Sequence, residues 1–266
     1  MSFVDKLKGA AHRVPHPHMP NVPPLPGLPP MPHPPGLLHL PPGVPHLPHV
    51  PGKGMTPDEV AYHKFPAVGT LKAGDMLIVK VWGVEKHMIG NVIRGGQAVF
   101  SHANGSSNDQ HALIMVSATK TAEAGGKGVH TSTVDTRAHL VFRITDTQLA
   151  HEAAYVGSRL IGQGGTVTPG KYNIPGAGTT FFRHKNVGPR AHAYLQRVYD
   201  VVYSNKHAKG PDMFCSQLVA TCVEVAAMRL HRHGLGVDPQ AMSPKALEAA
   251  FKVHPGLFHF LGRYPA

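Results

Sequence analysis

Residues 210–227, GPDMFCSQLVATCVEVAA, decide the fold of this chain. Pro211 cannot continue a helix and Asp212 is a common helix cap, so we expect a helix to begin within the next few residues. Beyond that point apolar residues recur at three- and four-residue spacing, which lays one stripe against a core. The stripe consists of Leu218, Val219, Cys222, Val225 and Ala226. The sequence therefore predicts a buried helix whose N-terminus opens on a surface or a cleft.

Cys215 falls in the first turn of this predicted helix. A thiol there lies at the positive end of the backbone dipole, beside N–H groups that have no partner within the helix. Both features favour the thiolate and can also hold an oxyanion. Cys215 is therefore a candidate nucleophile, although a lone cysteine is more commonly a small buried hydrophobe. Cys222, two turns further along, is predicted to be part of the core.

The composition of the 266 residues limits the kinds of partner. A formal net charge of +11 favours an anionic surface partner, such as nucleic acid, acidic glycan or anionic lipid. Lysine and arginine are scattered, however, and no nucleic-acid-binding module is recognisable, so no specific nucleic-acid partner is predicted. The N-terminal stretch MSFVDKLKGAAHRV has no continuous apolar segment, and no later stretch reaches transmembrane length. We expect a chain that is cytoplasmic on synthesis and that is secreted, if at all, by a route without a signal peptide.

Two regions differ sharply in composition: residues 1–55 are predicted to be a disordered arm rich in proline and histidine, and residues 56–266 a folded domain. Between 14 and 52, proline at nearly every second or third position removes N–H donors and favours polyproline II geometry, which prevents a packed core. Such an arm suits a proline-binding domain, secretion machinery, or a simple spacer. Prolines also separate its histidines, so no ligand set is preorganised and no metal site is predicted.

The folded region is predicted to be α+β, with an antiparallel meander sheet packed with helices. Alternating or continuous apolar residues indicate the strands, and capping or proline-started segments of helical period indicate the helices. Strands are expected within 71–83, 95–104, 112–116, 121–124, 129–135 and 138–144. Helices are expected within 55–65, 147–162, 189–204 and 243–253, with a long loop over 164–189 and an aromatic end at 257–264.

His111 is the candidate base for Cys215, because a cysteine nucleophile needs a base and a third group that orients the base. It stands immediately before a buried strand, at the mouth of the polar loop GSSNDQ, where its side chain can face a cleft. The chain has 21 histidines, so a histidine at a strand edge is also expected by chance and a surface role is the alternative.

His111 with ALIMV, then TAEAGGKGV, and much later the helix start FCSQLV resemble the circularly permuted papain-like families of the YiiX-like and NlpC-related kind. In these families the histidine strand precedes the cysteine helix. The resemblance spans residues 56–266 and is carried by the order and spacing of its pieces. They include a GD turn at Gly74 and Asp75, a polar residue about twelve positions after the histidine, a YN loop at Tyr172 and Asn173, a cysteine–serine pair, and a helix started by Ser243 and Pro244.

The resemblance implies Cys215 as the attacking thiolate, His111 as general base and then acid, and Glu123 as the group that holds the imidazole. His130 and Asp109 are alternatives to Glu123. A hairpin turn centred near residue 117 would place Glu123 opposite His111, whereas a turn centred near residue 119 would place residue 127 there.

The resemblance also bears on the groups around the triad. The backbone N–H of Cys215 would be one oxyanion donor, and the loop of Tyr172 and Asn173 is a candidate substrate-binding segment and source of a second donor. Gln217 stands where these families frequently have a glutamate. This departure argues against a role for a charge at position 217, and it does not affect the triad of Cys215, His111 and Glu123. No cofactor is implied.

The resemblance implies a cysteine peptidase or amidase that cleaves an amide bond of a peptide, an isopeptide or a peptidoglycan stem through a thioester acyl-enzyme. One alternative is a thiol acyltransferase or lipid esterase of the lecithin:retinol acyltransferase-like kind, although nothing here matches the hydrophobic membrane segment usual in those proteins. Another is a non-catalytic scaffold that presents the proline-rich arm. The expected partner is a peptide-like or acyl substrate, and a delivered bacterial effector or toxin is a further hypothesis.

Overall fold

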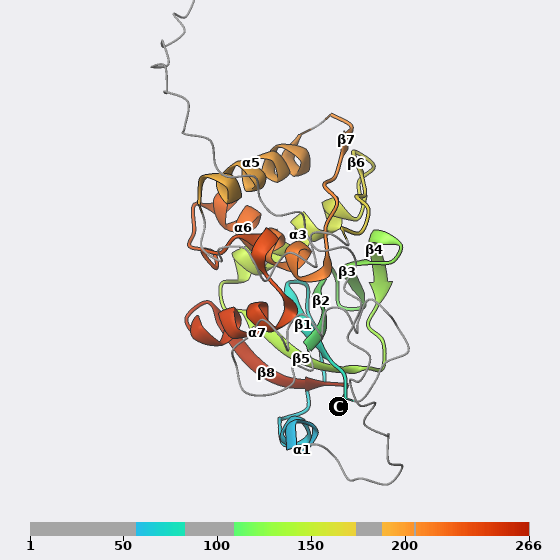
Figure 1. Ribbon diagram of the computed structural model, residues 1–266, viewed down its shortest axis with the longest axis vertical. Helices are drawn as coiled ribbons and strands as arrows, with labels where there is room; N and C mark the ends of the chain where they lie inside the picture. The colour runs from blue at the N-terminus through green and yellow to red at the C-terminus, as the bar shows by residue number, and fades with distance from the viewer. Residues whose placement is uncertain (1–56, 83–108, 174–187, 205, 266) are drawn as a thin grey trace, which may run out of the picture. The chain divides into compact units, whose positions relative to one another are not determined.

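The computed structural model describes residues 57–82, 109–173, 188–204 and 206–265, all of which belong to one unit, Lys53–Ala266 (Figure 1). The predicted arm at 1–55 and the strand predicted at 95–104 lie outside the described residues. In the described part, no helix is both long and apolar enough to cross a membrane.

A six-stranded antiparallel sheet forms the centre of this unit, in the order β4-β3-β2-β1-β5-β8 (Figure 1). Its strands are β1 (Asp75–Lys80), β2 (Asp109–Met115), β3 (Lys120–Gly125), β4 (Gly128–Thr133), β5 (Ala138–Ile144) and β8 (Phe258–Tyr264). A parallel pair, β6 (Val167–Thr168) and β7 (Ala208–Lys209), lies apart from it. The predicted α+β class, with an antiparallel sheet packed against helices, is confirmed.

The sheet departs from a simple meander in two places. Strands β2, β3 and β4 follow one another as predicted, but β1 pairs with both β2 and β5 and occupies the centre. The aromatic end of the chain, which we did not predict to be a strand, pairs with β5 as the edge strand β8. Burial on both faces explains the unbroken apolar run of β1, in which Met76, Leu77, Ile78 and Val79 are all 0% exposed.

The helices begin close to the predicted positions, because local capping chemistry sets these boundaries. Asp146 accepts hydrogen bonds from the first turn of α3, and Ser243 does the same for α7. The helices are α1 (Pro57–His63), α3 (Thr147–Leu160), α5 (Pro189–Tyr203), α6 (Cys215–Leu230) and α7 (Pro244–Val253), with a short 3-10 helix, η3, at Pro239–Ala241.

Helix α6 is in contact with both the central sheet and the other helices of the core. It packs against α3, α5 and α7 and against strands β2 and β3. Every residue from Cys215 to Ala227 is buried, so the single apolar stripe predicted from the sequence underestimates its burial. A helix buried all round is typical of a protein core, and α6 therefore fixes its own N-terminus firmly against the sheet.

Asp212 does not cap α6, contrary to the expectation from its sequence position. The residue before the helix is Phe214, and the Asp212 carboxylate instead accepts a 2.8 Å hydrogen bond from the backbone N–H of Lys171. Asp212 therefore ties the start of α6 to a distant segment of the chain.

Candidate active site

The first turn of α6 brings Cys215 to His111 on β2. Cys215 is the first residue of the helix and is 1% exposed. Its side chain forms a hydrogen bond with the side chain of His111. The structure therefore brings together the two residues that the sequence pattern selected, although they are 104 positions apart in the chain.

His111 lies at an irregularity of the sheet. It pairs with Val79 of β1, and the register shifts at the next step, where Lys80 pairs with Asp109. A bulge of this kind turns a side chain away from the direction that the regular pleat would give it. The strand also begins earlier than predicted. It starts at Asp109, so His111 is the third residue of β2 and not the residue before the strand.

Glu123 on β3 holds the other side of the His111 ring. Its Oε2 lies 2.8 Å from Nε2 of His111, which leaves Nδ1 of the ring for the sulfur of Cys215. Ile114 pairs with Ala122 and Met115 with Thr121, so the turn is centred at residue 118, between the two registers considered from the sequence. Glu123 nevertheless reaches the imidazole, and Cys215, His111 and Glu123 form a continuous chain of polar contacts.

The two alternatives to Glu123 have other positions. His130 lies directly opposite Glu123 on β4, and its Nε2 is 3.3 Å from Oε1 of Glu123. Its Nδ1 lies 2.9 Å from the carbonyl oxygen of Gly128. His130 therefore contacts the carboxylate and not the reacting pair. Asp109 opens β2, and its side chain lies outside the described residues.

The charges of the site favour a thiolate beside an imidazolium. Burial raises the pKa of Cys215, but the charge and hydrogen bond of His111, with backbone hydrogen bonds from Ala112 and Ser216, lower it overall. Burial lowers the pKa of His111, but the charge and hydrogen bond of Cys215, followed by those of Glu123, raise it to about 9. Burial raises the pKa of Glu123, and the His111 contact outweighs this and lowers it. All three shifts favour the charged forms, in the order minus, plus, minus from Cys215 through His111 to Glu123.

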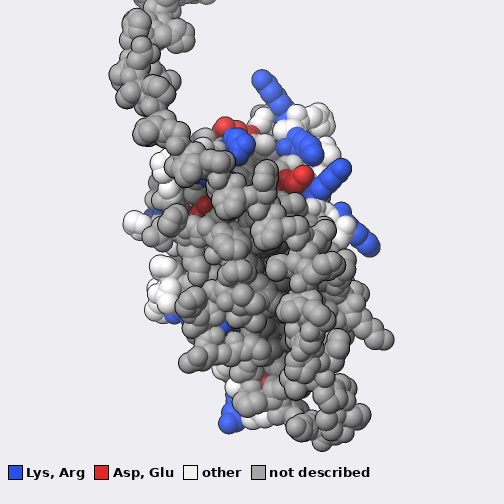
Figure 2. Space-filling view, in the orientation of Figure 1, with Lys and Arg blue, Asp and Glu red and all other residues white. Residues whose placement is uncertain are grey.

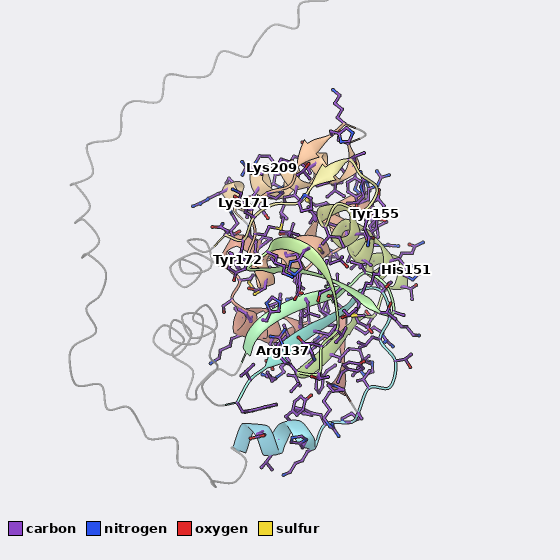
Figure 3. The ribbon with its side chains drawn as sticks, turned by 90° about the vertical axis from the view of Figure 1, so that its right-hand side faces the viewer. Arg137, His151, Tyr155, Lys171, Tyr172 and Lys209 are labelled. Atoms are coloured by element: carbon purple, nitrogen blue, oxygen red, sulfur yellow. The ribbon has the colours of Figure 1, made fainter. Side chains whose placement is uncertain are left out.

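Tyr172 also reaches the sulfur, and the backbone of Asn173 is bonded to the segment that precedes α6. Burial, and then the charge and hydrogen bond of Cys215, raise the pKa of Tyr172, so its phenol keeps its proton. Tyr172 forms an isolated parallel bridge with Met213, and the N–H of Asn173 donates to the Met213 carbonyl at 3.0 Å. Figure 3 shows Tyr172 and its neighbour Lys171 on the same side of the folded unit.

The segment that carries Tyr172 is held by contacts that the sequence reasoning missed. Besides the Asp212 carboxylate, the carbonyl of Gly170 accepts a 2.9 Å hydrogen bond from Val129 of β4. A Cβ on Gly170 would lie 2.0 Å from the carbonyl oxygen of Pro211, so only glycine permits this approach. The dipeptide Pro169-Gly170 was the available signal, since a glycine in a loop often marks close backbone contact.

Gln217 and Cys222 occupy structural positions on α6. The amide of Gln217 donates to the Tyr194 hydroxyl at 3.0 Å and accepts from the N–H of Phe214, so no charge is held there. Cys222 is 0% exposed, and burial raises the pKa of its thiol well above the usual range. The prediction that Cys222 belongs to the core is confirmed. Among the described residues, no group of three or more histidine, cysteine or acidic side chains is arranged to hold a metal ion.

Comparison of the chain with protein-family models, with curated proteins and with solved structures finds no match.

Proposed function

We propose that the protein is a cysteine hydrolase of the circularly permuted papain-like kind, which cleaves an amide bond in a peptide, an isopeptide or a peptidoglycan stem. The observation that carries the proposal is the position of the His111 ring between the Cys215 sulfur and the Glu123 carboxylate. A nucleophile, a base and a group that orients the base are the parts that thiol hydrolysis requires. The chain order, with the histidine strand before the cysteine helix, supports the permuted form.

In the first half of the reaction the Cys215 thiolate attacks the carbonyl carbon, and the electron pair of the C=O bond moves to oxygen. The backbone N–H of Cys215 and the protonated phenol of Tyr172 are suited to donate to this oxyanion. The imidazolium of His111 then gives the proton on its sulfur-facing nitrogen to the amine as the C–N bond breaks. The amine leaves, and a thioester remains on Cys215.

In the second half, neutral His111 removes a proton from water, and the resulting hydroxide attacks the thioester carbon. Collapse of the second tetrahedral intermediate expels the Cys215 thiolate and releases the acid. Glu123 keeps its negative charge throughout and stabilises the imidazolium each time it forms.

The test uses a library of acyl-peptidyl aminocoumarins, in which cleavage of the amide releases the fluorophore. We expect hydrolysis by the unaltered protein and by Cys222→Ala, and none by Cys215→Ala. Intact-mass measurement should find an acyl adduct on Cys215 during turnover. Hydrolysis that persists in Cys215→Ala would contradict the proposal.

Matched oxygen esters of the same acyl peptides separate the alternatives. Turnover of the esters without the amides would favour the acyltransferase or lipid esterase, and the absence of any adduct on Cys215 would favour the scaffold.

A further inference from the structure

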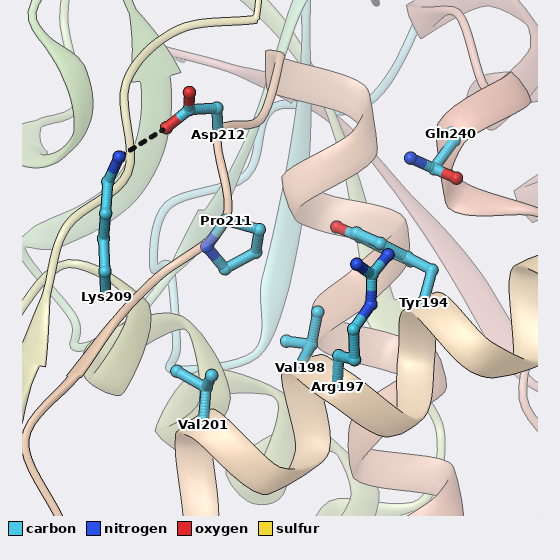
Figure 4. Close-up of a pocket in the computed structure, with 8 residues that line it drawn as sticks. All are labelled: Tyr194, Arg197, Val198, Val201, Lys209, Pro211, Asp212 and Gln240. Atoms are coloured by element: carbon cyan, nitrogen blue, oxygen red, sulfur yellow. Dashed lines mark ion pairs between the residues drawn. The ribbon is translucent and has the colours of Figure 1, made fainter.

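A second site adjoins the start of α6, on the side where α5 packs. It is an open pocket of about 300 Å³, with segment 209–212 on one side and α5 on the other (Figure 4). Helix α5 contributes Tyr194, Arg197, Val198 and Val201, and the remaining lining residues are Lys209, Pro211, Asp212 and Gln240. None of these side chains belongs to the chain of contacts from Cys215 through His111 to Glu123.

The pocket lies near the candidate nucleophile along the chain. Asp212 is three residues before Cys215, and at about 3.6 Å per extended residue the two α-carbons are at most about 11 Å apart. Tyr194 also connects the pocket to the first turn of α6, because its hydroxyl accepts the hydrogen bond from Gln217. A group bound in the pocket would therefore lie about two or three peptide units from the sulfur.

The charged side chains of the pocket favour a single negative charge. Among the described residues, Arg197 has no hydrogen bond and no ion pair, and the residue is exposed. Lys209 is 3.9 Å from Asp212, the one acidic residue in the lining, so two cations face one anion. Figure 2 shows mainly lysine and arginine side chains projecting where β6 and β7 lie. The remaining positive charge suits a carboxylate, whereas the Asp212 carboxylate disfavours a dianion such as phosphate.

The rest of the lining is apolar. Val198, Val201 and Pro211 face the same space, and they can cover a short aliphatic group beside the bound carboxylate. The Tyr194 hydroxyl is already engaged by Gln217 and lies 3.2 Å from the hydroxyl of Thr221, so the ring contributes surface rather than a free donor.

We propose that this pocket binds a carboxylate carried on a short aliphatic group. The consequence for catalysis rests on the proposed hydrolase function. The pocket selects substrates that have such a carboxylate two or three peptide units from the bond that is cleaved. Arg197 is the main anchor of the carboxylate, and Lys209 supplies the second positive charge.

The binding test uses two probes that differ only in charge, N-acetyl-L-leucine and N-acetyl-L-leucinamide, titrated into the full chain and followed by NMR. We expect the acid to bind about two- to fivefold more tightly than the amide, the range for a charge pair that is partly exposed. Arg197→Ala should remove this preference. Arg190→Ala, at an exposed position of the same helix outside the pocket, should keep it.

Cys215→Ala separates this inference from the proposed function, because the variant lacks the nucleophile and keeps the pocket. Preferential binding of the acid to Cys215→Ala supports the pocket even if no hydrolysis is found. Equal affinity of the two probes, or an unchanged preference in Arg197→Ala, would overturn the inference whatever the activity of the protein.

Discussion

The two cysteines of α6 lie seven residues apart on one helix and differ completely in chemistry. Both are buried, with exposures of 1% for Cys215 and 0% for Cys222. Burial raises the pKa of each thiol. At Cys222 only a backbone hydrogen bond lowers the pKa, and its effect is smaller than that of burial. At Cys215 the imidazolium of His111 and two backbone hydrogen bonds reverse the shift. The comparison teaches that positioned charge and N–H groups, not exposure, distinguish the candidate nucleophile from the core thiol.

The largest effect should be the difference in reactivity between these thiols. Iodoacetamide at pH 7 should alkylate Cys215 at least about a hundredfold faster than Cys222, because the thiolate is the reacting form. Peptide mapping by mass spectrometry would measure both rates in one sample. Equal labelling of the two residues would remove the basis for the catalytic proposal.

Two single variants control this measurement. Cys222→Ala should keep the fast alkylation, and Cys215→Ser should lose it while remaining folded by circular dichroism. Fast labelling of Cys222 in Cys215→Ser would indicate that the core around α6 opens, and the comparison would then have to be made under conditions that stabilise the fold.

Loss of the Tyr172 hydroxyl should have the next largest effect. Tyr172→Phe removes a donor to the thiolate and a candidate donor to the oxyanion, so kcat should fall by about a hundredfold, the usual cost of one such donor. The thiolate should also titrate at higher pH, which the pH dependence of alkylation would measure. Tyr155→Phe, on the exposed surface of α3, is the matched control and should change neither quantity. Equal kcat values for Tyr172→Phe and the unaltered protein would show that the Tyr172 hydroxyl is not an oxyanion donor.

Amide hydrolysis and alkylation should depend differently on pH, because hydrolysis needs the proton of His111 and alkylation needs only the thiolate of Cys215. His111 keeps its proton up to about pH 9, so amide hydrolysis should fall as the pH rises through about 9, where the proton for the leaving amine is lost. Alkylation needs only the thiolate and should not fall there. Glu123 raises the pKa of His111, so Glu123→Gln should move the fall in hydrolysis about one pH unit lower. An unmoved profile would show that Glu123 does not tune the imidazole.

Local sequence pattern predicted one part of the site: the proline at 211 and the apolar period predicted α6, with Cys215 in its first turn. Glu123 came from the family resemblance, and the local pattern left the hairpin register open between two alternatives, because neither turn residue fixes it. The position of β1 between β2 and β5 and the edge strand β8 could not be predicted, because such pairings join residues far apart in sequence and leave no local period. Asp212 was misassigned for the same reason. Its carboxylate is a plausible cap by position, yet a residue 41 positions away, Lys171, takes the hydrogen bond.

The smallest effect should come from His130, which touches the carboxylate rather than the reacting pair. Its Nδ1 faces the Gly128 carbonyl and therefore carries a proton, so its Nε2 donates to Glu123 only when the ring is also protonated there. His130→Ala should lower kcat by about two- to fivefold, the range of a partly exposed charge pair. His130→Gln, whose amide can donate to Glu123, should restore most of the loss, and His233→Ala, at an exposed position, should have no effect. A loss of kcat in His130→Ala as large as the hundredfold loss expected for Tyr172→Phe would mean that His130, and not only Glu123, sets the orientation of the imidazole.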